Sequence, residues 1–181
     1  MIFFTIETER LFLRKIVPET YHYVFEHFSE KELQEFLGIS SPEKLQKEKE
    51  KFKNGITTHN RSMVLFQLLD KKSNTVIGGC GYHTWYLDHD RAEIGYALTD
   101  DNFKGMGLMS EALQHVLDYG FDTMQLHRVE AFISPTNSAS IQLVNKFGFI
   151  KEGHLRQHYQ KDGRFEDSVV YSLLKEEHLK R

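Results

Sequence analysis

The segment KGMGLM, Lys104 to Met109, combines features of an anion-binding site. Its two glycines allow backbone N–H groups to approach a ligand closely, and Lys104 adds a positive charge. A helix is predicted to begin at about Gly107, so its first turn offers unpaired N–H groups and a partial positive charge. No acidic residue lies between Phe103 and Ser110. The segment therefore suits a pyrophosphate, although a bare GxG also occurs in ordinary turns.

The common nucleotide-binding motifs do not fit this segment. KGMGLMS lacks the spacing of GxxxxGK followed by Ser or Thr, and no GxGxxG precedes an acidic residue at the expected distance. The sequence thus argues against an ATPase or a dinucleotide-binding enzyme.

The strand predicted just before the loop, Ala92 to Leu98, has one unusually open face. Alternation places Glu93, Gly95 and Ala97 on the same side of this strand. One carboxylate and two very small side chains leave room for a thin ligand beside the sheet.

The remaining patterns predict the elements that must position these residues. Alternating or apolar runs predict strands over residues 9–16, 63–70, 75–85, 92–98, 127–134, 150–159 and 165–174. Helical patterns cover residues 19–37, the segment that follows the cap at Ser41, residues 107–124, and a short helix that Asn137 or Thr136 caps and Gly148 ends. No linker or repeat divides the chain, so we expect one mixed α/β domain over residues 1–181.

Composition narrows the classes of partner. The chain has 181 residues, 40% of them hydrophobic, and a net charge of -3, which gives no electrostatic case for nucleic acid. A single cysteine, Cys80, excludes an intrachain disulfide, and no histidine spacing indicates zinc, so we expect no metal. No segment approaches the roughly 20 apolar residues of a spanning helix. We expect a cytoplasmic protein with no membrane association.

Two segments, AEIGYALTDDNFKGMGLMSEAL and HRVEAFISPTNSASIQLVNKFGFIKEGHLR, resemble the coenzyme A-binding core of the GNAT acetyltransferase superfamily. The resemblance is strongest to the branch of ribosomal-protein alanine and serine N-acetyltransferases. It implies an α/β (α+β) fold with a mixed, mostly antiparallel sheet of about six or seven strands, flanked by about four helices. It also implies a splay between the fourth and fifth strands, acetyl-coenzyme A as co-substrate, and a monomer or homodimer.

The resemblance assigns the coenzyme site residue by residue. In the (Q/R)xxGx(G/A) loop of the superfamily, Lys104 stands at the Gln/Arg position, Gly105 follows it, Gly107 matches the glycine, and Met109 replaces the last small residue. The pantetheine arm is expected in the splay, against the backbone of the strand. The expected coenzyme-binding residues are Tyr96, Ala97, Leu98, Lys104, Gly105, Met106, Gly107, Leu108, Met109, Asn137 and Ser140.

Acetyl transfer to an amine needs a neutral nucleophile and release of a thiolate. Glu93 is the candidate base, directly or through water; the alternative is a structural carboxylate. Ser140, in NxxS, is expected to face the coenzyme's sulfur, with an ordinary small helix residue as its alternative. Many family members have a tyrosine acid where this chain has Val144.

The acceptor side is less defined. A carboxylate of the ribosomal-protein enzymes falls at Tyr159 here, which weakens ribosomal protein as the acceptor. His158 and Tyr159 are candidates for one wall of the acceptor site and His83 and Trp85 for the other; the alternative is that they are exposed strand residues. We expect a protein N-terminus, possibly ribosomal, or a small primary amine as acceptor. The alternative function is a non-catalytic acyl-coenzyme A binding module.

Overall fold

The computed structural model describes residues 3–55 and 57–180. Eight strands form one sheet in the order β1-β2-β3-β4-β5-β6-β8-β7. The strands are β1 (Thr5–Glu7), β2 (Leu11–Ile16), β3 (Arg61–Asp70), β4 (Val76–Tyr86), β5 (Arg91–Leu98), β6 (Arg128–Ile133), β7 (Ile150–Lys161) and β8 (Arg164–Leu174). All neighbours are antiparallel except β5 and β6. The predicted fold class is confirmed, and β1 is the strand that the sequence patterns did not indicate.

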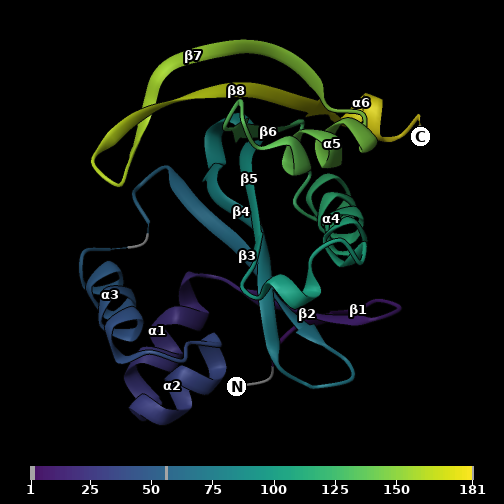
Figure 1. Ribbon diagram of the computed structural model, residues 1–181. Coiled ribbons are helices and arrows are strands. Elements are labelled where there is room, and N and C mark those ends of the chain that lie inside the picture. Colours follow the sequence, from purple (N-terminus) through teal and green to yellow (C-terminus); the bar gives the residue numbers. More distant parts are fainter. Residues whose placement is uncertain (1–2, 56, 181) are drawn as a thin grey trace.

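Six α-helices lie in the described residues: α1 (Pro18–His27), α2 (Glu30–Leu37), α3 (Pro42–Lys53), α4 (Leu108–Asp118), α5 (Ser138–Lys146) and α6 (Lys175–His178). Helices α1 to α3 form a lobe at one end of the sheet, α4 and α5 lie beside β5 and β6, and the β7–β8 hairpin arches over the other end (Figure 1). A π-helical turn, Tyr119–Thr123, continues α4. None of the helices described is long and apolar enough to cross a membrane.

The helical region expected over residues 19–37 is two helices rather than one. Ser29 interrupts it, because its side chain accepts a hydrogen bond from the Glu32 backbone N–H and the Glu32 carboxylate accepts one from the Ser29 N–H. This reciprocal cap begins a new helix. The split, together with the short α6, raises the number of helices above the four expected.

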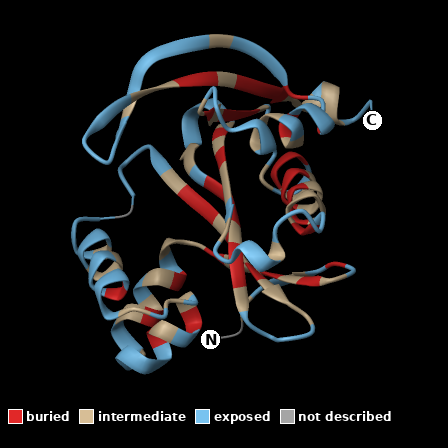
Figure 2. Ribbon diagram, viewed as in Figure 1, coloured by how far each residue is buried: buried red, intermediate tan, exposed pale blue. Residues whose placement is uncertain are grey.

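The core has two parts. The larger one lies between the sheet and the helices α4 and α5, and includes the fully buried Leu113, Leu117 and Leu173. The smaller one joins α1 to α3 to β2 through Ile16, Val24, Leu33, Phe36 and Leu45. Buried residues follow the middle strands and α4, while β7 is exposed along most of its length (Figure 2). The central sheet and α4 are thus the rigid base on which the site is built.

Strands β5 and β6 run parallel and pair over only three residues each. Arg91 to Glu93 of β5 match Arg128 to Glu130 of β6. Beyond Glu93 the two strands separate, which is the splay expected between the fourth and fifth predicted strands; β1 shifts the count by one. Arg91 and Arg128 both donate to the buried Glu130 carboxylate at the paired end. This ion-pair network closes the narrow end of the splay.

Candidate active site

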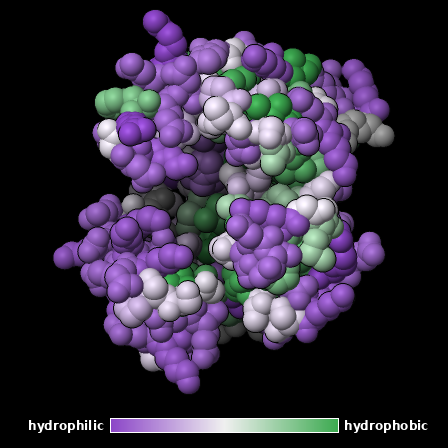
Figure 3. Space-filling model, in the orientation of Figure 1, coloured by the Kyte–Doolittle hydropathy of each residue, from purple (hydrophilic) through white to green (hydrophobic). Residues whose placement is uncertain are grey.

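Two pockets open from the splay and meet inside it. The first, of about 640 Å³, lies between the end of β5, the loop before α4, and α5. The second, of about 560 Å³, lies between β5, β6 and the β7–β8 hairpin. Tyr96, Asn137 and Ser140 line both pockets. We refer to the first as the donor pocket and to the second as the acceptor pocket, after the roles that the resemblance implies for them. On the face drawn in Figure 3 the surface is hollowed between the lobe of α1 to α3 and the hairpin end of the molecule.

The loop before α4 has the geometry of an anion cradle. Gly105 and Gly107 have φ of 73° and 77°, and Gly107 is the residue from which α4 begins. An added Cβ at Gly105 would meet no atom within 4 Å, so the loop leaves open space on that side. Left-handed backbone of this kind turns successive N–H groups toward a common point. The loop and the helix start can therefore receive a pyrophosphate.

Glu111 lies in the first turn of α4, where its charge would oppose an anion. Arg10 neutralises it: Arg10 Nε lies 2.7 Å from Glu111 Oε2, and the Thr8 hydroxyl donates to Oε1 over 2.6 Å. Arg10 Nη1 also donates to the carbonyl of Met106 over 2.8 Å. Arg10 thus connects the loop to the segment before β2, and its positive charge compensates the negative charge of Glu111 at the helix start.

Two lysines line the donor pocket. Lys104 forms an ion pair with Asp101, so its charge is partly compensated. Lys146, at the end of α5, donates to Ser110 Oγ over 2.7 Å and was not identified from the sequence. The sequence feature that could have indicated Lys146 is its position nine residues after Asn137, at the end of the helix that faces α4. The Met106 side chain is 56% exposed and does not line the pocket; the other expected coenzyme residues do.

His83 and Glu93 form a pair in the acceptor pocket. Their Nε2 and Oε1 atoms lie 3.0 Å apart. A bulge in β4 creates this contact, since Tyr82 pairs with Ile94 and Thr84 with Glu93, which leaves His83 as the extra residue. Such bulges redirect a side chain. A Cβ at Gly95 would lie 2.8 Å from His83 Nδ1. The small residues of this strand were expected to leave room for a ligand, but the space above Gly95 holds the His83 ring.

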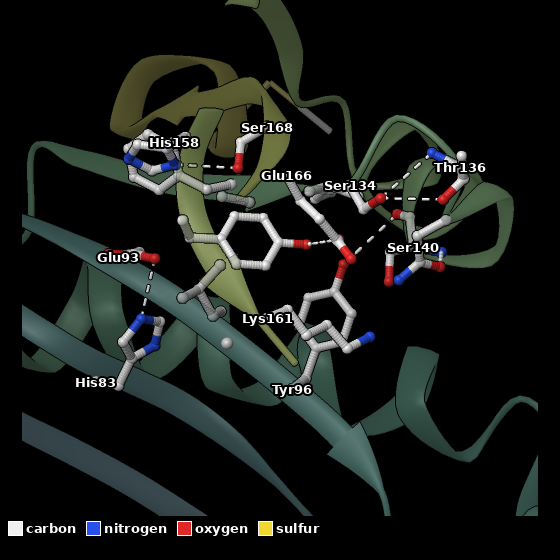
Figure 4. Close-up of a pocket in the computed structure, with 17 residues that line it drawn as sticks. His83, Glu93, Tyr96, Ser134, Thr136, Ser140, His158, Lys161, Glu166 and Ser168 are labelled. Atoms are coloured by element: carbon white, nitrogen blue, oxygen red, sulfur yellow. Dashed lines mark hydrogen bonds and ion pairs between the residues drawn. The ribbon is translucent and has the colours of Figure 1, made fainter. Parts of the chain in front are cut away.

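The start of α5 lies at the junction of the pockets. Asn137 Oδ1 accepts a hydrogen bond from the Ser140 N–H over 3.1 Å, which identifies Asn137, not Thr136, as the cap. The Tyr96 hydroxyl points at the Ser140 carbonyl over a long 3.5 Å (Figure 4). Burial raises the pKa of Tyr96 to about 12, so its phenol stays protonated. Val144, at the position where the resemblance would place a tyrosine, is fully buried in the core.

The β7–β8 hairpin supplies the outer wall. In β7 the pairing shifts between Leu155, opposite Ser168, and Tyr159, opposite Glu166. Asp167 holds this irregularity by accepting from the Gln157 N–H over 2.7 Å, with Gln157 at φ 50°. The irregularity allows the neighbours His158 and Tyr159 both to line the acceptor pocket.

Glu166 of β8 also lines this pocket, and the sequence analysis missed it. The sequence feature that could have indicated Glu166 is the turn, because Asp162 and Gly163, with φ of 49° and 77°, form a two-residue hairpin loop. Counting back from such a loop places Tyr159 opposite Glu166. Trp85, expected in the acceptor wall, instead packs against the main core.

A family model described as "Acetyltransferase (GNAT) domain" matches residues 10–150. The chain is also 35% identical over 176 residues to an uncharacterized N-acetyltransferase, p20, of Bacillus licheniformis; the match covers 96% of this chain and 98% of that protein. This chain belongs to the GNAT acetyltransferase family. The expected resemblance is thereby confirmed, and the protein is an acetyltransferase.

Two further relatives illustrate the range of the family. The ribosomal protein uS5-alanine N-acetyltransferase of Escherichia coli is 35% identical over 101 residues, 56% of this chain and 47% of that protein. The crystal structure of a GNAT-family acetyltransferase from Bacillus anthracis superposes with a TM-score of 0.66 at 26% identity, and covers 96% of this chain and 99% of that one. The comparisons give no support to a non-catalytic binding module.

Cys80 lines neither of the two pockets. Burial raises the pKa of the Cys80 thiol well above its ordinary value, which disfavours the thiolate and hence a covalent acetyl-cysteine. Within residues 3–55 and 57–180, no three His, Cys, Asp or Glu side chains are grouped as metal ligands.

Proposed function

We propose that this acetyltransferase moves the acetyl group of acetyl-coenzyme A to a primary amine by direct attack. The observation that carries the proposal is the meeting of two pockets at Tyr96, Asn137 and Ser140. One pocket has the cradle for a pyrophosphate, and the other has a carboxylate–imidazole pair. Two substrates entering from opposite sides would meet at the junction, without a covalent enzyme intermediate.

The proposed position of acetyl-coenzyme A is based on the backbone of the loop before α4 and of β5. The pyrophosphate would lie on the N–H groups of residues 105–109, with Lys104 and Lys146 beside it. The pantetheine arm would lie along the separated part of β5, near Tyr96 to Leu98, where β6 no longer pairs with it. This position brings the thioester to Ser140.

The acceptor side supplies the proton chemistry. The amine must lose a proton, and the proposed receiver is Glu93 with His83, through water if the amine does not reach them. The nitrogen then attacks the thioester carbon, the C–S bond breaks, and the coenzyme leaves as a thiolate. The nitrogen loses its second proton in this step, and the thiolate or a water molecule takes it up. The Ser140 hydroxyl and the protonated Tyr96 phenol are the proposed hydrogen-bond donors to that sulfur.

The acceptor class is a protein N-terminus or a small amine. An α-amino group, with a pKa of about 7.7 to 8.0, needs less help from a base than an aliphatic amine near 10.4. The E. coli relative is named for ribosomal protein uS5, but Tyr159 replaces the carboxylate expected for that branch. The open acceptor pocket and its second carboxylate favour a small amine.

The test is thiol release from acetyl-coenzyme A while N-terminal peptides, lysine peptides, polyamines and aminoglycosides are offered in turn. Turnover with one class would identify the acceptor. Tight acetyl-coenzyme A binding with no turnover on any of them would contradict the proposal.

A further inference from the structure

The acceptor pocket holds two carboxylates on different elements. Glu93 comes from β5 and Glu166 from β8. Figure 4 shows them in separate parts of the pocket, with Glu93 beside His83 and Glu166 toward Tyr96 and Ser140. An amine with a single positive charge needs only one of them, so the second carboxylate requires its own explanation.

Glu166 is held in place by its neighbour across the hairpin. Tyr159 lies opposite it in the register, and the Tyr159 hydroxyl donates to Glu166 Oε2 over 2.7 Å. Both side chains are half-buried and line the pocket. The shift in β7 that Asp167 and Gln157 hold sets the position of Tyr159. Glu166 is therefore fixed at a defined place instead of moving freely in solvent.

The charge of Glu166 is available to a ligand. Its Tyr159 partner is a neutral phenol, and the hydrogen bond to Glu166 raises the pKa of Tyr159, which keeps the phenol protonated. The other titratable side chains that line the pocket are His83, Glu93, Tyr96, His158 and Lys161, of which Tyr96 is a phenol kept protonated by burial. His83 is bound to Glu93, and His158 Nδ1 lies 3.0 Å from Ser168 Oγ. Lys161 is exposed at the tip of the hairpin.

We propose that Glu166 binds a second, permanently charged amino group of the acceptor, so that dicationic amines are preferred over amines with one charge. This inference rests on the proposed function. The reacting amine must become neutral, whereas a carboxylate next to an ammonium group stabilises its charged form. The two carboxylates differ in their partners, since Glu93 is paired with the imidazole of His83 and Glu166 accepts from a neutral phenol. Glu166 therefore fits the amino group that does not react, and Glu93 with His83 fits the one that does. The volume of about 560 Å³ is within the range that small-molecule sites have.

The test compares two acceptors of equal length, 1,4-diaminobutane and pentylamine, in which a methyl group replaces the second ammonium. In the unaltered enzyme we expect kcat/KM to be about tenfold higher for the diamine. Glu166→Gln should remove this preference by raising the KM of the diamine about tenfold. The kcat for the diamine, and both kcat and KM for pentylamine, should stay within about twofold of the unaltered enzyme. Tyr159→Phe should have a smaller effect of the same kind, and Glu166→Asp should restore part of the preference.

Glu176→Gln is the matched control, because it removes one negative charge from an exposed residue of α6 away from both pockets. It should leave kcat/KM for both acceptors unchanged. Equal preference in the unaltered enzyme and Glu166→Gln would overturn the role of Glu166, and so would an equal loss of kcat with both amines. Absence of turnover by the unaltered enzyme with every amine would overturn the proposed function itself.

Discussion

His83 Nε2 lies 3.0 Å from Glu93 Oε1, at the point where one extra residue interrupts the pairing of β4 with β5. The contact between the two side chains holds each of them in a defined position. Together they join an imidazole to a carboxylate that orients it, which is an arrangement suited to a general base. The pair lies in the acceptor pocket, where the proposed reaction requires an incoming amine to lose its proton.

Glu93→Gln should lower kcat about 100-fold, the lower end of the range for loss of a general base, with the acetyl-coenzyme A affinity within about twofold. The amide keeps the size of the side chain but cannot take a proton. Steady-state kinetics, with calorimetry for the coenzyme, would check this. Unchanged kcat across the neutral pH range would leave Glu93 a structural partner of His83.

Gly107→Ala should weaken acetyl-coenzyme A binding about tenfold, because the left-handed φ of 77° is unfavourable for alanine and the cradle must distort. The nearest atom to an added Cβ, Arg10 Nη2, is 3.6 Å away, so strain rather than a clash is the cause. Gly163→Ala is the control: it has the same φ and open space, but lies in the β7–β8 turn. Calorimetry should show a loss only for Gly107→Ala; equal affinities for the two variants would remove the pyrophosphate assignment.

Ser140→Ala should lower kcat about tenfold through loss of one hydrogen-bond donor at the sulfur, without a change in coenzyme affinity. Ser138→Ala, two residues earlier in α5, is the control, because Ser138 is exposed and lines neither pocket. Rapid single-turnover measurements would separate this effect from product release. If the two variants behave alike, Ser140 is only a small residue in the first turn.

Glu152→Gln should change how stability depends on acid. Hydrogen bonds from Arg128 and then Ser172 lower the pKa of Glu152 from 4.5 to about 2. Because the folded protein holds this carboxylate ionised, the stabilisation is complete above about pH 4.5 and is lost as the pH falls toward 2. Urea unfolding should show the variant less stable than the parent at pH 7 and the difference shrinking toward pH 2.

Glu176→Gln, at an exposed residue, should follow the parent protein throughout this pH range. A stability difference between Glu152→Gln and the parent that did not depend on pH would show that the Arg128 and Ser172 contacts do not act through ionisation.

The donor side could be predicted from sequence because its determinants are local. The glycines, the helix start and the Asn137 cap lie within short segments whose conformation depends on neighbouring residues. Residues 105–109 therefore needed no knowledge of distant contacts. The neutralisation of Glu111 by Arg10 did need it, since the two residues are about a hundred positions apart in the chain.

The acceptor side could not be predicted in the same way, because two strand irregularities determine it. Strict alternation would turn His83 away from Glu93, and only the extra residue in β4 brings them together. The tyrosine at position 159, in place of a carboxylate, weakened the case for a ribosomal-protein acceptor, whereas Glu166 supplies a carboxylate from the opposite strand. The Asp162–Gly163 turn carries that information, because a two-residue loop determines which residues of the two strands lie opposite each other.

The short pairing of β5 with β6 leaves two strand edges facing each other in the middle of the sheet. Exposed strand edges recruit any extended chain that can hydrogen-bond to them. A pantetheine arm between these strands would serve as a missing strand, and would join the β1–β5 half of the sheet to the β6–β8 half. Mass action would then make the acyl donor a stabiliser of the fold. Binding of the donor would thus raise the free energy of unfolding as well as bring the acetyl group to the site.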